Sequence, residues 1–141
     1  MIEKGYIQIY TGDGKGKTTA ALGLGLRAVG NGNRVMMFQF LKGRPTGELE
    51  SIKQLGGLFN IRRLAENKKF FWELNDEEKA AFRDQVQGEW HEVVEQVQSG
   101  NWDLVILDEI LGTITNGMVD PEQLEQVMKT KPEHTELVIT G

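Results

Sequence analysis

This chain has 141 residues, and the ones whose types and spacing most clearly suggest chemistry are residues 11–19. They read Thr-Gly-Asp-Gly-Lys-Gly-Lys-Thr-Thr, between a β-rich run and a helical run, which is the context that a phosphate-binding loop requires. Glycines allow the positive φ angles that turn backbone N–H groups into one concavity. The following helix adds free N–H groups and the positive end of its dipole. The segment therefore predicts a site for the phosphates of a nucleoside triphosphate, namely ATP with Mg²⁺.

Two side chains of this loop have specific predicted roles. Lys17 would place a mobile cation on the phosphates, and the Thr18 hydroxyl would be a ligand of Mg²⁺. Thr11 occupies the position of the first glycine in the standard pattern, so the prediction depends on context. The alternative is a strand–helix turn that is glycine-rich for other reasons. The predicted nucleotide-binding residues here are Gly12, Asp13, Gly14, Lys15, Gly16, Lys17, Thr18 and Thr19.

The second chemical pattern is an apolar run at residues 104–107 that ends in Asp108 and Glu109. A buried strand that delivers an acid to the carboxyl edge of the sheet, beside a phosphate loop, can hold the metal ion. One acid would bind Mg²⁺ directly or through water, and the other would orient it or polarise a water. The residues alone leave open which acid has which role, and a strand that ends in solvated acids is the alternative.

The rest of the chain alternates β-rich and helical stretches, which is typical of a mainly parallel sheet with helices on both faces. We predict a single P-loop α/β domain over residues 1–141. Strands are expected at residues 6–10, 34–40, 58–64, 103–109 and 136–140. Helical patterns cover residues 17–29, closed by Gly30 in a left-handed conformation, residues 47–55, a long stretch from Asp76 to Ser99–Gly100, and a start at residues 120–123.

Two further features accompany these elements. The long helix has an apolar stripe that we expect to face the core, consisting of Phe82, Val86, Trp90, Val93, Val94 and Val97. Residues 65–75 read as a polar loop interrupted by Phe70, Phe71 and Trp72. An isolated run of aromatic residues more often anchors a loop to the core than forms a cofactor site.

Composition narrows the classes of function. A net charge of −5 argues against a broad nucleic-acid surface, which needs clustered Lys and Arg. A local nest of amides can still bind a small anion. The absence of cysteine excludes a disulfide scaffold or a thiolate metal site and suits a reducing compartment. No signal peptide or membrane span is visible, so we expect a cytoplasmic protein that binds neither nucleic acid nor membrane.

The chain offers few candidates for a general base. Its two histidines are His91, inside the long helix, and His134, in a loop after Pro132, and we expect both to be structural or solvated. Transfer to an ordinary hydroxyl usually needs a base. The chemistry must therefore use Glu109 with water, as in an ATPase, or a nucleophile that needs no base, which a cofactor could supply.

The order of these motifs resembles the ATP:corrinoid adenosyltransferases of the cobalamin pathway. The variant phosphate loop at residues 12–21 and the run Arg27-Ala28-Val29-Gly30 are similar to that family. The resemblance continues through Gln39-Phe40-Leu41-Lys42-Gly43, Gly47-Glu48, Phe70-Phe71-Trp72-Glu73, Leu107-Asp108-Glu109 and Val138-Ile139-Thr140-Gly141. It covers essentially the whole chain. Each segment alone is a weak signal, whereas the ordered set is fairly specific.

The resemblance implies a function. These enzymes move the 5′-deoxyadenosyl group of ATP to the cobalt(I) of a reduced corrinoid and release triphosphate, and cobalt(I) carries no proton to remove. The phosphate loop would hold the triphosphate in the reverse sense to ordinary P-loop ATPases. Lys17, Thr18 and Glu109 would be the catalytic residues, with Thr18, Glu109 and a supporting Asp108 at the Mg²⁺ ion.

The resemblance also assigns residues outside the loop and the acids. Arg27 matches a family position near the nucleotide, although a surface arginine is the alternative. Phe70 and Trp72 match positions that press on the corrin face and help to remove the lower axial ligand of cobalt. A homodimer and an electron-donating flavoprotein are the implied partners. A P-loop ATPase using Glu109, or a nucleotide- or corrinoid-binding module without turnover, are the alternatives.

Two departures from the family pattern concern the ends of the chain. The family has an amino-terminal arm that crosses onto a partner subunit, whereas five residues precede Tyr6 here. The family also continues after the final strand with an arginine and a further helix that help to close the nucleotide site. We therefore expect the chain to lack its C-terminal tail.

Overall fold

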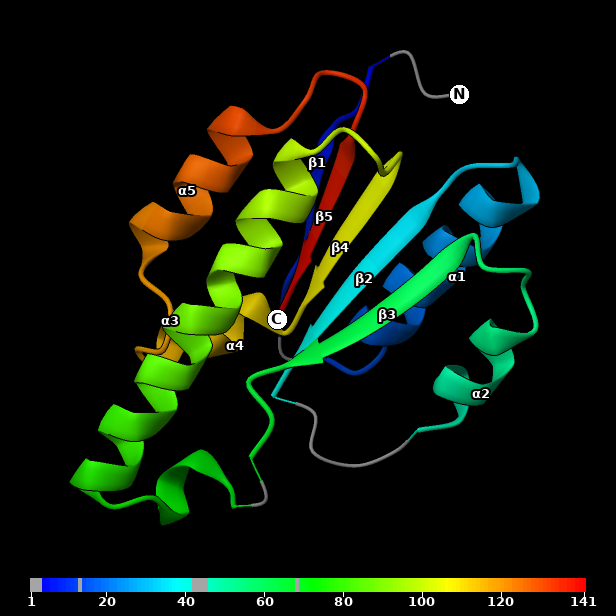
Figure 1. Ribbon diagram of the computed structural model, residues 1–141. Coiled ribbons are helices and arrows are strands. Elements are labelled where there is room, and N and C mark those ends of the chain that lie inside the picture. Colours follow the sequence, from blue (N-terminus) through cyan, green and yellow to red (C-terminus); the bar gives the residue numbers. More distant parts are fainter. Residues whose placement is uncertain (1–3, 13, 42–45, 68) are drawn as a thin grey trace.

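The computed structural model describes residues 4–12, 14–41, 46–67 and 69–141 (Figure 1). Its strands are β1 (Ile7–Tyr10), β2 (Val35–Phe40), β3 (Phe59–Leu64), β4 (Leu104–Asp108) and β5 (Glu136–Thr140). Its helices are α1 (Lys17–Gly30), α2 (Gly47–Lys53), α3 (Asp76–Gln98), α4 (Ile110–Thr115) and α5 (Pro121–Thr130), with a 3₁₀ turn η1 (Phe71–Glu73). The strands predicted from the sequence are confirmed to within a residue or two at each end.

The strands form one parallel sheet in the order β1-β5-β4-β2-β3. Because all of them run in the same direction, their carboxyl ends lie at a single edge, where ligands bind in open α/β sheets. The strand before the glycine loop, β1, is separated from the acidic strand β4 by β5 alone. The fold therefore brings the loop and the acids to neighbouring positions.

Helices cover both faces of the sheet, as predicted (Figure 1). On one face, α1 packs over a cluster that includes Ala21, Met37, Phe59 and Val138. On the other face, α3, α4 and α5 bury a larger cluster. Strand β2 is almost entirely buried, which fits its nearly continuous apolar sequence. The inward stripe predicted for α3 is confirmed, since five of its six residues are buried and Val94 packs partly buried against the cluster.

Short-range sequence signals explain where the longer helices begin. Asn75 accepts a hydrogen bond from the Glu78 amide, and the Glu78 carboxylate accepts one from the Asn75 amide. Asp120 and Gln123 form the predicted capping box at the start of α5, next to Pro121. Such reciprocal bonds satisfy amides that have no acceptor within the helix.

Three local predictions need correction. The predicted left-handed cap at Gly30 is wrong, because α1 continues through Gly30 and the left-handed residue is Gly32, with φ of +81°. Helix α4 was not predicted, since its six residues are mostly apolar or β-branched and lack a capping side chain. Turn η1 was read as loop because three residues give no periodicity.

No helix among the described residues is long and apolar enough to span a bilayer.

The contact between α1 and β3 generates a stability prediction. A Cβ atom added at Gly25 would lie 2.4 Å from Cε2 of the buried Phe59 ring. Gly25→Ala should therefore lower the free energy of unfolding by about 1–3 kcal/mol, because the core would be overpacked. Gly23 of the same helix has open space around its Cβ position, so Gly23→Ala should raise stability by about 0.5–1 kcal/mol. Urea unfolding measures both, and equal effects would contradict this view of the contact.

Candidate functional site

The loop between β1 and α1 has the backbone shape of a phosphate cradle. Gly12 and Gly16 adopt φ angles of +129° and +104°, which strain any residue with a side chain. A Cβ atom added at Gly12, Gly14 or Gly16 would meet nothing within 4 Å. Within the described part of the chain, nothing therefore blocks the approach of a ligand to the backbone at these three glycines.

The first turn of α1 points unpaired donors at this loop. The Ala20 amide makes the first helical hydrogen bond, to the Gly16 carbonyl at 2.8 Å. The amides of Lys17, Thr18 and Thr19 precede it and have no acceptor within the helix. The first turn contains no acidic side chain, and no side chain of a described residue caps it. An anion placed there would receive both the N–H groups and the positive end of the helix dipole.

The Lys17 ammonium already lies across the loop. Its Nζ donates hydrogen bonds to the carbonyls of Gly12 at 2.7 Å and Gly14 at 2.9 Å. An ammonium has three donors, so one remains for a phosphate oxygen while the other two keep the side chain in place. Lys15 and Thr19, which are also predicted nucleotide ligands, are exposed at the same loop.

A buried carboxylate connects the loop to the acidic end of the strand. Asp108 is fully buried, and its Oδ1 accepts hydrogen bonds from the Thr18 hydroxyl at 2.9 Å and from the Thr140 hydroxyl at 2.7 Å. Thr18 and Asp108 are 90 positions apart in sequence. Their contact brings together the two motifs that the sequence analysis identified separately.

Asp108 belongs to a polar row that crosses the sheet at its carboxyl edge. Tyr10 is in register with Thr140. Asp108 lies beside Thr140, because the preceding residues Leu107 and Ile139 are in register. Gln39 is in register with Asp108 on one side and with Arg63 on the other. Residues in register on parallel strands point to the same face. The Arg63 guanidinium donates to the Gln39 amide oxygen at 3.2 Å. The last row of the sheet at this edge is therefore polar, with hydrogen bonds between Asp108 and Thr140 and between Gln39 and Arg63.

Backbone strain is concentrated at this edge. Among the described residues, the non-glycine residues with positive φ are Leu41, Ala65 and Glu109, at +65°, +55° and +66°. Each of them comes directly after a strand, β2, β3 or β4. Such conformations cost roughly 1–3 kcal/mol and cluster at functional sites. Glu109 is the only one of the three that also carries a charged side chain.

The donor set fits a magnesium ion that is also bound by phosphate. Thr18 uses its hydroxyl hydrogen on Asp108, so both lone pairs of its oxygen remain available to a cation. In the described part of the chain, no three His, Asp or Glu side chains converge on a possible metal centre. Mg²⁺ typically binds one or two protein oxygens and completes its shell with phosphates and water. Thr18 and the half-buried Glu109 suit such a site, with Asp108 behind them.

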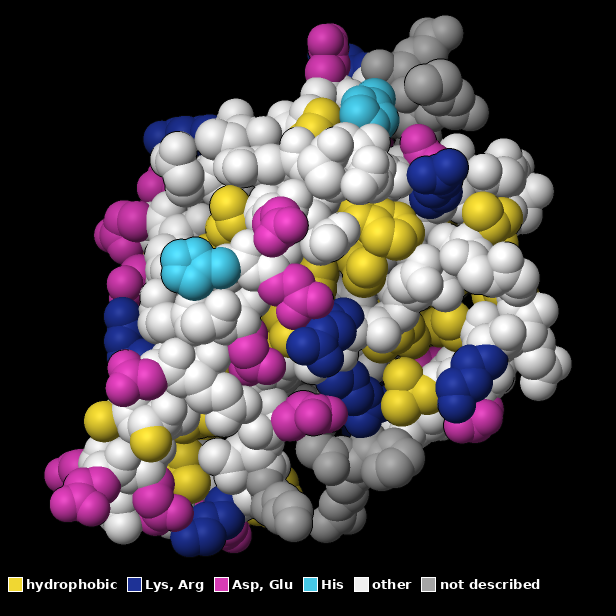
Figure 2. Space-filling model, in the orientation of Figure 1, with side chains coloured by type: hydrophobic (Ala, Val, Ile, Leu, Met, Phe, Trp, Pro, Cys, Tyr) yellow, Lys and Arg dark blue, Asp and Glu magenta, His cyan; other side chains and the backbone are white. Residues whose placement is uncertain are grey.

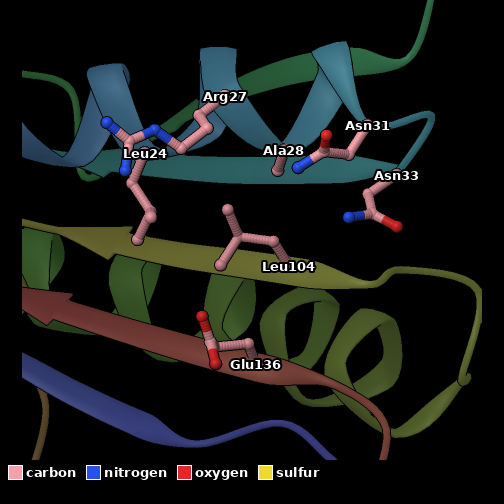
Figure 3. A pocket seen from close by; sticks show the side chains of 7 residues that line it. All are labelled: Leu24, Arg27, Ala28, Asn31, Asn33, Leu104 and Glu136. Carbon is pink, nitrogen blue, oxygen red and sulfur yellow. The ribbon is translucent and has the colours of Figure 1, made fainter. Parts of the chain in front are cut away.

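Arg27 lies away from this loop. It is ten residues after Lys17 on α1, or about 15 Å along the helix axis, and borders a small pocket at the amino end of the sheet together with Asn31, Asn33 and Glu136. Figure 3 shows its guanidinium extending past Leu24 toward the carboxyl ends of the strands, the direction in which helical side chains lean. Its role at the nucleotide remains a prediction.

The aromatic segment presents a stacked pair at the surface. The rings of Phe70 and Trp72 are 4.5 Å apart at their centroids and 3° from parallel. Their side chains are 56% and 76% exposed, whereas Phe71 packs partly buried against the core. An isolated run of aromatic residues usually anchors a loop to the core. Here Phe71 anchors the segment to the core, and the exposed rings of Phe70 and Trp72 are available for a flat apolar ligand.

An ion pair attaches this segment to α3. Lys69 Nζ lies 2.8 Å from Glu78 Oε2. The hydrogen bond from Lys69 lowers the pKa of Glu78, and the bond to Glu78 raises the pKa of Lys69. Both groups are therefore charged at neutral pH, where solvent screens this exposed pair.

Both histidines lie away from the phosphate loop, as expected. His91 is exposed on α3, and His134 Nε2 lies 3.1 Å from the Gly100 carbonyl at the amino end of the sheet.

On the described part of the face shown in Figure 2, acidic and basic side chains are interspersed and form no continuous basic tract.

Asp13, a predicted nucleotide ligand, and Lys42 and Gly43 of the resemblance lie outside the described residues.

Sequence reasoning gave no role to two residues at the site, although both stand in runs that carry the family resemblance. Thr140 contacts Asp108, and Gln39 is a buried polar residue beside it in the sheet. A polar residue in the last positions of an apolar strand is a weak signal for both. Their importance depends on which strands are neighbours, and the sequence pattern does not give the strand order.

Comparison with known proteins supports the same interpretation. A family model described as "ATP:corrinoid adenosyltransferase BtuR/CobO/CobP" matches residues 3–141. A corrinoid adenosyltransferase of Escherichia coli strain K12 is 33% identical over 142 residues, which cover 99% of this chain and 68% of that protein. Corrinoid adenosyltransferase CobA of Salmonella typhimurium is 33% identical over 140 residues, with the same coverage. A Sinorhizobium corrinoid adenosyltransferase is 35% identical over 144 residues, 99% of this chain and 64% of that protein.

The loop geometry predicts the effect of removing its cation. Lys17→Ala should raise the Kd for ATP about 10- to 100-fold, because a hydrogen bond to a charged group contributes about 1.5–3 kcal/mol. Lys129→Ala, an exposed lysine in the last turn of α5, is the matched control and should leave the Kd unchanged. Isothermal titration calorimetry measures both. Equal affinities for the two variants would show that the loop is not the phosphate site.

Proposed function

Since the chain belongs to the ATP:corrinoid adenosyltransferase family, we propose that it transfers the 5′-deoxyadenosyl group of MgATP to cobalt(I) of a reduced corrinoid. Triphosphate is the second product, and the reaction belongs to cobalamin synthesis or salvage. The contact of Thr18 with Asp108 carries the nucleotide half of this proposal, because it joins the phosphate loop to the acidic strand end. The family membership carries the corrinoid half.

The loop stabilises the leaving group. As the C5′–O bond breaks, its electron pair stays on the triphosphate, whose negative charge grows. The free amides at the start of α1 and the Lys17 ammonium are fixed donors around that charge. Preorganised donors of this kind stabilise a transition state without reorganising during the reaction. A bound magnesium ion would neutralise further charge on the phosphates, held by Thr18 and Glu109 with Asp108 in support.

The nucleophile requires no base. Cobalt(I) donates an electron pair to C5′ and becomes cobalt(III) in the new Co–C bond, so that no proton has to be removed. This matches a site whose described surroundings contain Glu109 but neither histidine. The remaining tasks of the protein are to align C5′ with cobalt and to exclude water.

The stacked pair of Phe70 and Trp72 is the proposed contact for the corrin ring. Its two rings are parallel and exposed, and aromatic faces pack well against flat apolar surfaces. In the family resemblance, these positions displace the lower axial ligand of cobalt. Loss of that ligand makes reduction easier, because the added electron enters an orbital that the ligand destabilises.

Four further parts of the proposal come from the resemblance and the composition. A flavoprotein would supply the electrons that reduce the corrinoid to cobalt(I). A homodimer would be the functional assembly. The cytoplasm would be the location, which suits a chain of 141 residues without cysteine. Arg27 is included as a nucleotide contact, because its guanidinium leans from α1 toward the carboxyl edge (Figure 3).

A product assay tests the activity. The purified chain, incubated anaerobically with MgATP and a chemically reduced corrinoid, should yield adenosylated corrinoid and inorganic triphosphate in equal amounts. Chromatography of the nucleotides and the visible spectrum of the corrinoid identify both products. ADP and phosphate formed without corrinoid, and lost in Glu109→Gln, would instead identify an ATPase.

The aromatic pair predicts a selective defect. Trp72→Ala should lower the corrinoid-dependent kcat/KM by about 10-fold or more, because it removes half of the stacked surface. The Kd for MgATP should change by less than about 2-fold, since Trp72 follows β3 at the opposite edge of the sheet from β1. Tyr6→Ala, another exposed aromatic residue, is the control. A Trp72→Ala enzyme with unchanged corrinoid kinetics would exclude the pair from the corrinoid site.

A further inference from the structure

We propose that Thr140 is a positioning residue that sets both acids of the site for a nucleotide carrying Mg²⁺; this inference rests on the MgATP site of the proposed function. Thr140 is the last residue of β5 and is fully buried. Its Oγ1 lies 2.7 Å from Asp108 Oδ1 and 3.0 Å from the Glu109 amide nitrogen. A single hydroxyl therefore contacts the carboxylate of one acid and the backbone of the next.

The chemistry of the partners fixes the direction of both hydrogen bonds. An ionised carboxylate can only accept, and an amide N–H can only donate. The Thr140 hydroxyl must therefore give its hydrogen to Asp108 and receive the hydrogen of Glu109. A methyl group in place of the hydroxyl can do neither, even though valine has nearly the same shape.

The bond to Asp108 determines what Thr18 can offer. Carboxylate torsions are broad, and the Thr140 hydroxyl is one of the contacts that fix the Asp108 plane. It binds the same oxygen, Asp108 Oδ1, that accepts the Thr18 hydrogen. Because Thr18 gives its hydrogen to Asp108, the lone pairs of its oxygen point away from Asp108 and can bind a cation. Thr140 thus acts on a cation through Asp108 and Thr18.

The bond to Glu109 holds a strained backbone. Glu109 has φ of +66°, and its amide is bound by Thr140 while its carbonyl accepts from the Thr113 hydroxyl at 2.8 Å and the Thr113 amide at 3.1 Å. A strained conformation persists when its surroundings fix it from several sides. Because Glu109 is also the N-cap residue of α4, this clamp fixes the direction in which its side chain leaves the backbone.

A purely structural role makes a different prediction. In that case the Thr140 hydroxyl would only satisfy buried polar groups, and its loss would lower stability without changing the response to metal. A positioning role predicts that loss of the hydroxyl weakens ATP binding in the presence of Mg²⁺ and leaves it nearly unchanged without Mg²⁺. The ratio of ATP affinities with and without Mg²⁺ separates the two.

The experiment measures that ratio in the full chain. ATP binding is titrated calorimetrically with Mg²⁺ and with a chelator, for the wild type, Thr140→Val and Thr140→Ser, together with the melting temperature of each. Thr140→Val should weaken ATP binding with Mg²⁺ by about 10-fold and without Mg²⁺ by less than about 2-fold. Thr140→Ser should recover the wild-type ratio to within about 3-fold.

A matched control is available at the start of the same strand. Thr135 is also fully buried, and its hydroxyl donates to the Trp102 carbonyl at 3.0 Å. It precedes β5 at the amino edge, so Thr135→Val should leave the ratio unchanged. If Thr140→Val does not fold, Thr140→Cys is compared with Thr140→Ser: both lack the methyl group of threonine, and the thiol is a weaker donor than the hydroxyl, so Thr140→Cys should reduce the ratio by at least about 3-fold.

Two results would overturn the proposal. One is a Thr140→Val or, failing its folding, a Thr140→Cys protein with the wild-type ratio. The other is a wild-type affinity for ATP that does not respond to Mg²⁺. The readout contains no corrinoid, so it is independent of product formation. A wild type that passes this test but makes no adenosylated corrinoid would reject the proposed function and retain the role of Thr140.

Discussion

The hydrogen bond between the Thr18 hydroxyl and the Asp108 carboxylate connects the two halves of the site. A buried carboxylate is costly unless donors compensate for its lost hydration, and Asp108 receives two hydroxyl groups on one oxygen. One of them comes from the first turn of α1 and the other from the end of β5. The distance between the phosphate loop and the acids is therefore set by buried contacts of the fold and does not depend on a surface loop.

The polar row at the carboxyl edge shows how the sheet carries this arrangement. Asp108, Thr140 and Gln39 lie side by side on β4, β5 and β2, and two positions earlier the same strands contribute Ile106, Val138 and Met37 to the core. The parallel sheet keeps both rows in register, so packing of the apolar row orders the polar one. The left-handed residues after β2, β3 and β4 occur where this regular scaffold ends.

The proposed reaction would use two separate surfaces. Charge stabilisation would belong to the loop at β1, where the amides at the start of α1 and Lys17 would bind the phosphates. Recognition of a flat apolar ring would belong to the exposed pair of Phe70 and Trp72 after β3. This division suits a nucleophile that needs alignment and no proton transfer, because the protein then contributes positioning and electrostatics.

The sequence by itself determined the strands, the inner face of α3 and the glycine loop between β1 and α1, because periodicity and glycine spacing act over a few residues. The sequence pattern wrongly predicted that Gly30 ends α1, because glycines at 30 and 32 both suit a left-handed conformation. It did not predict α4, because a helix of six residues is too short to show a helical period. Only the tertiary structure revealed that Thr140 connects Asp108 with Glu109. Strand order and register bring these residues together, and both follow from burial and pairing between segments far apart in the chain, which local sequence patterns do not encode.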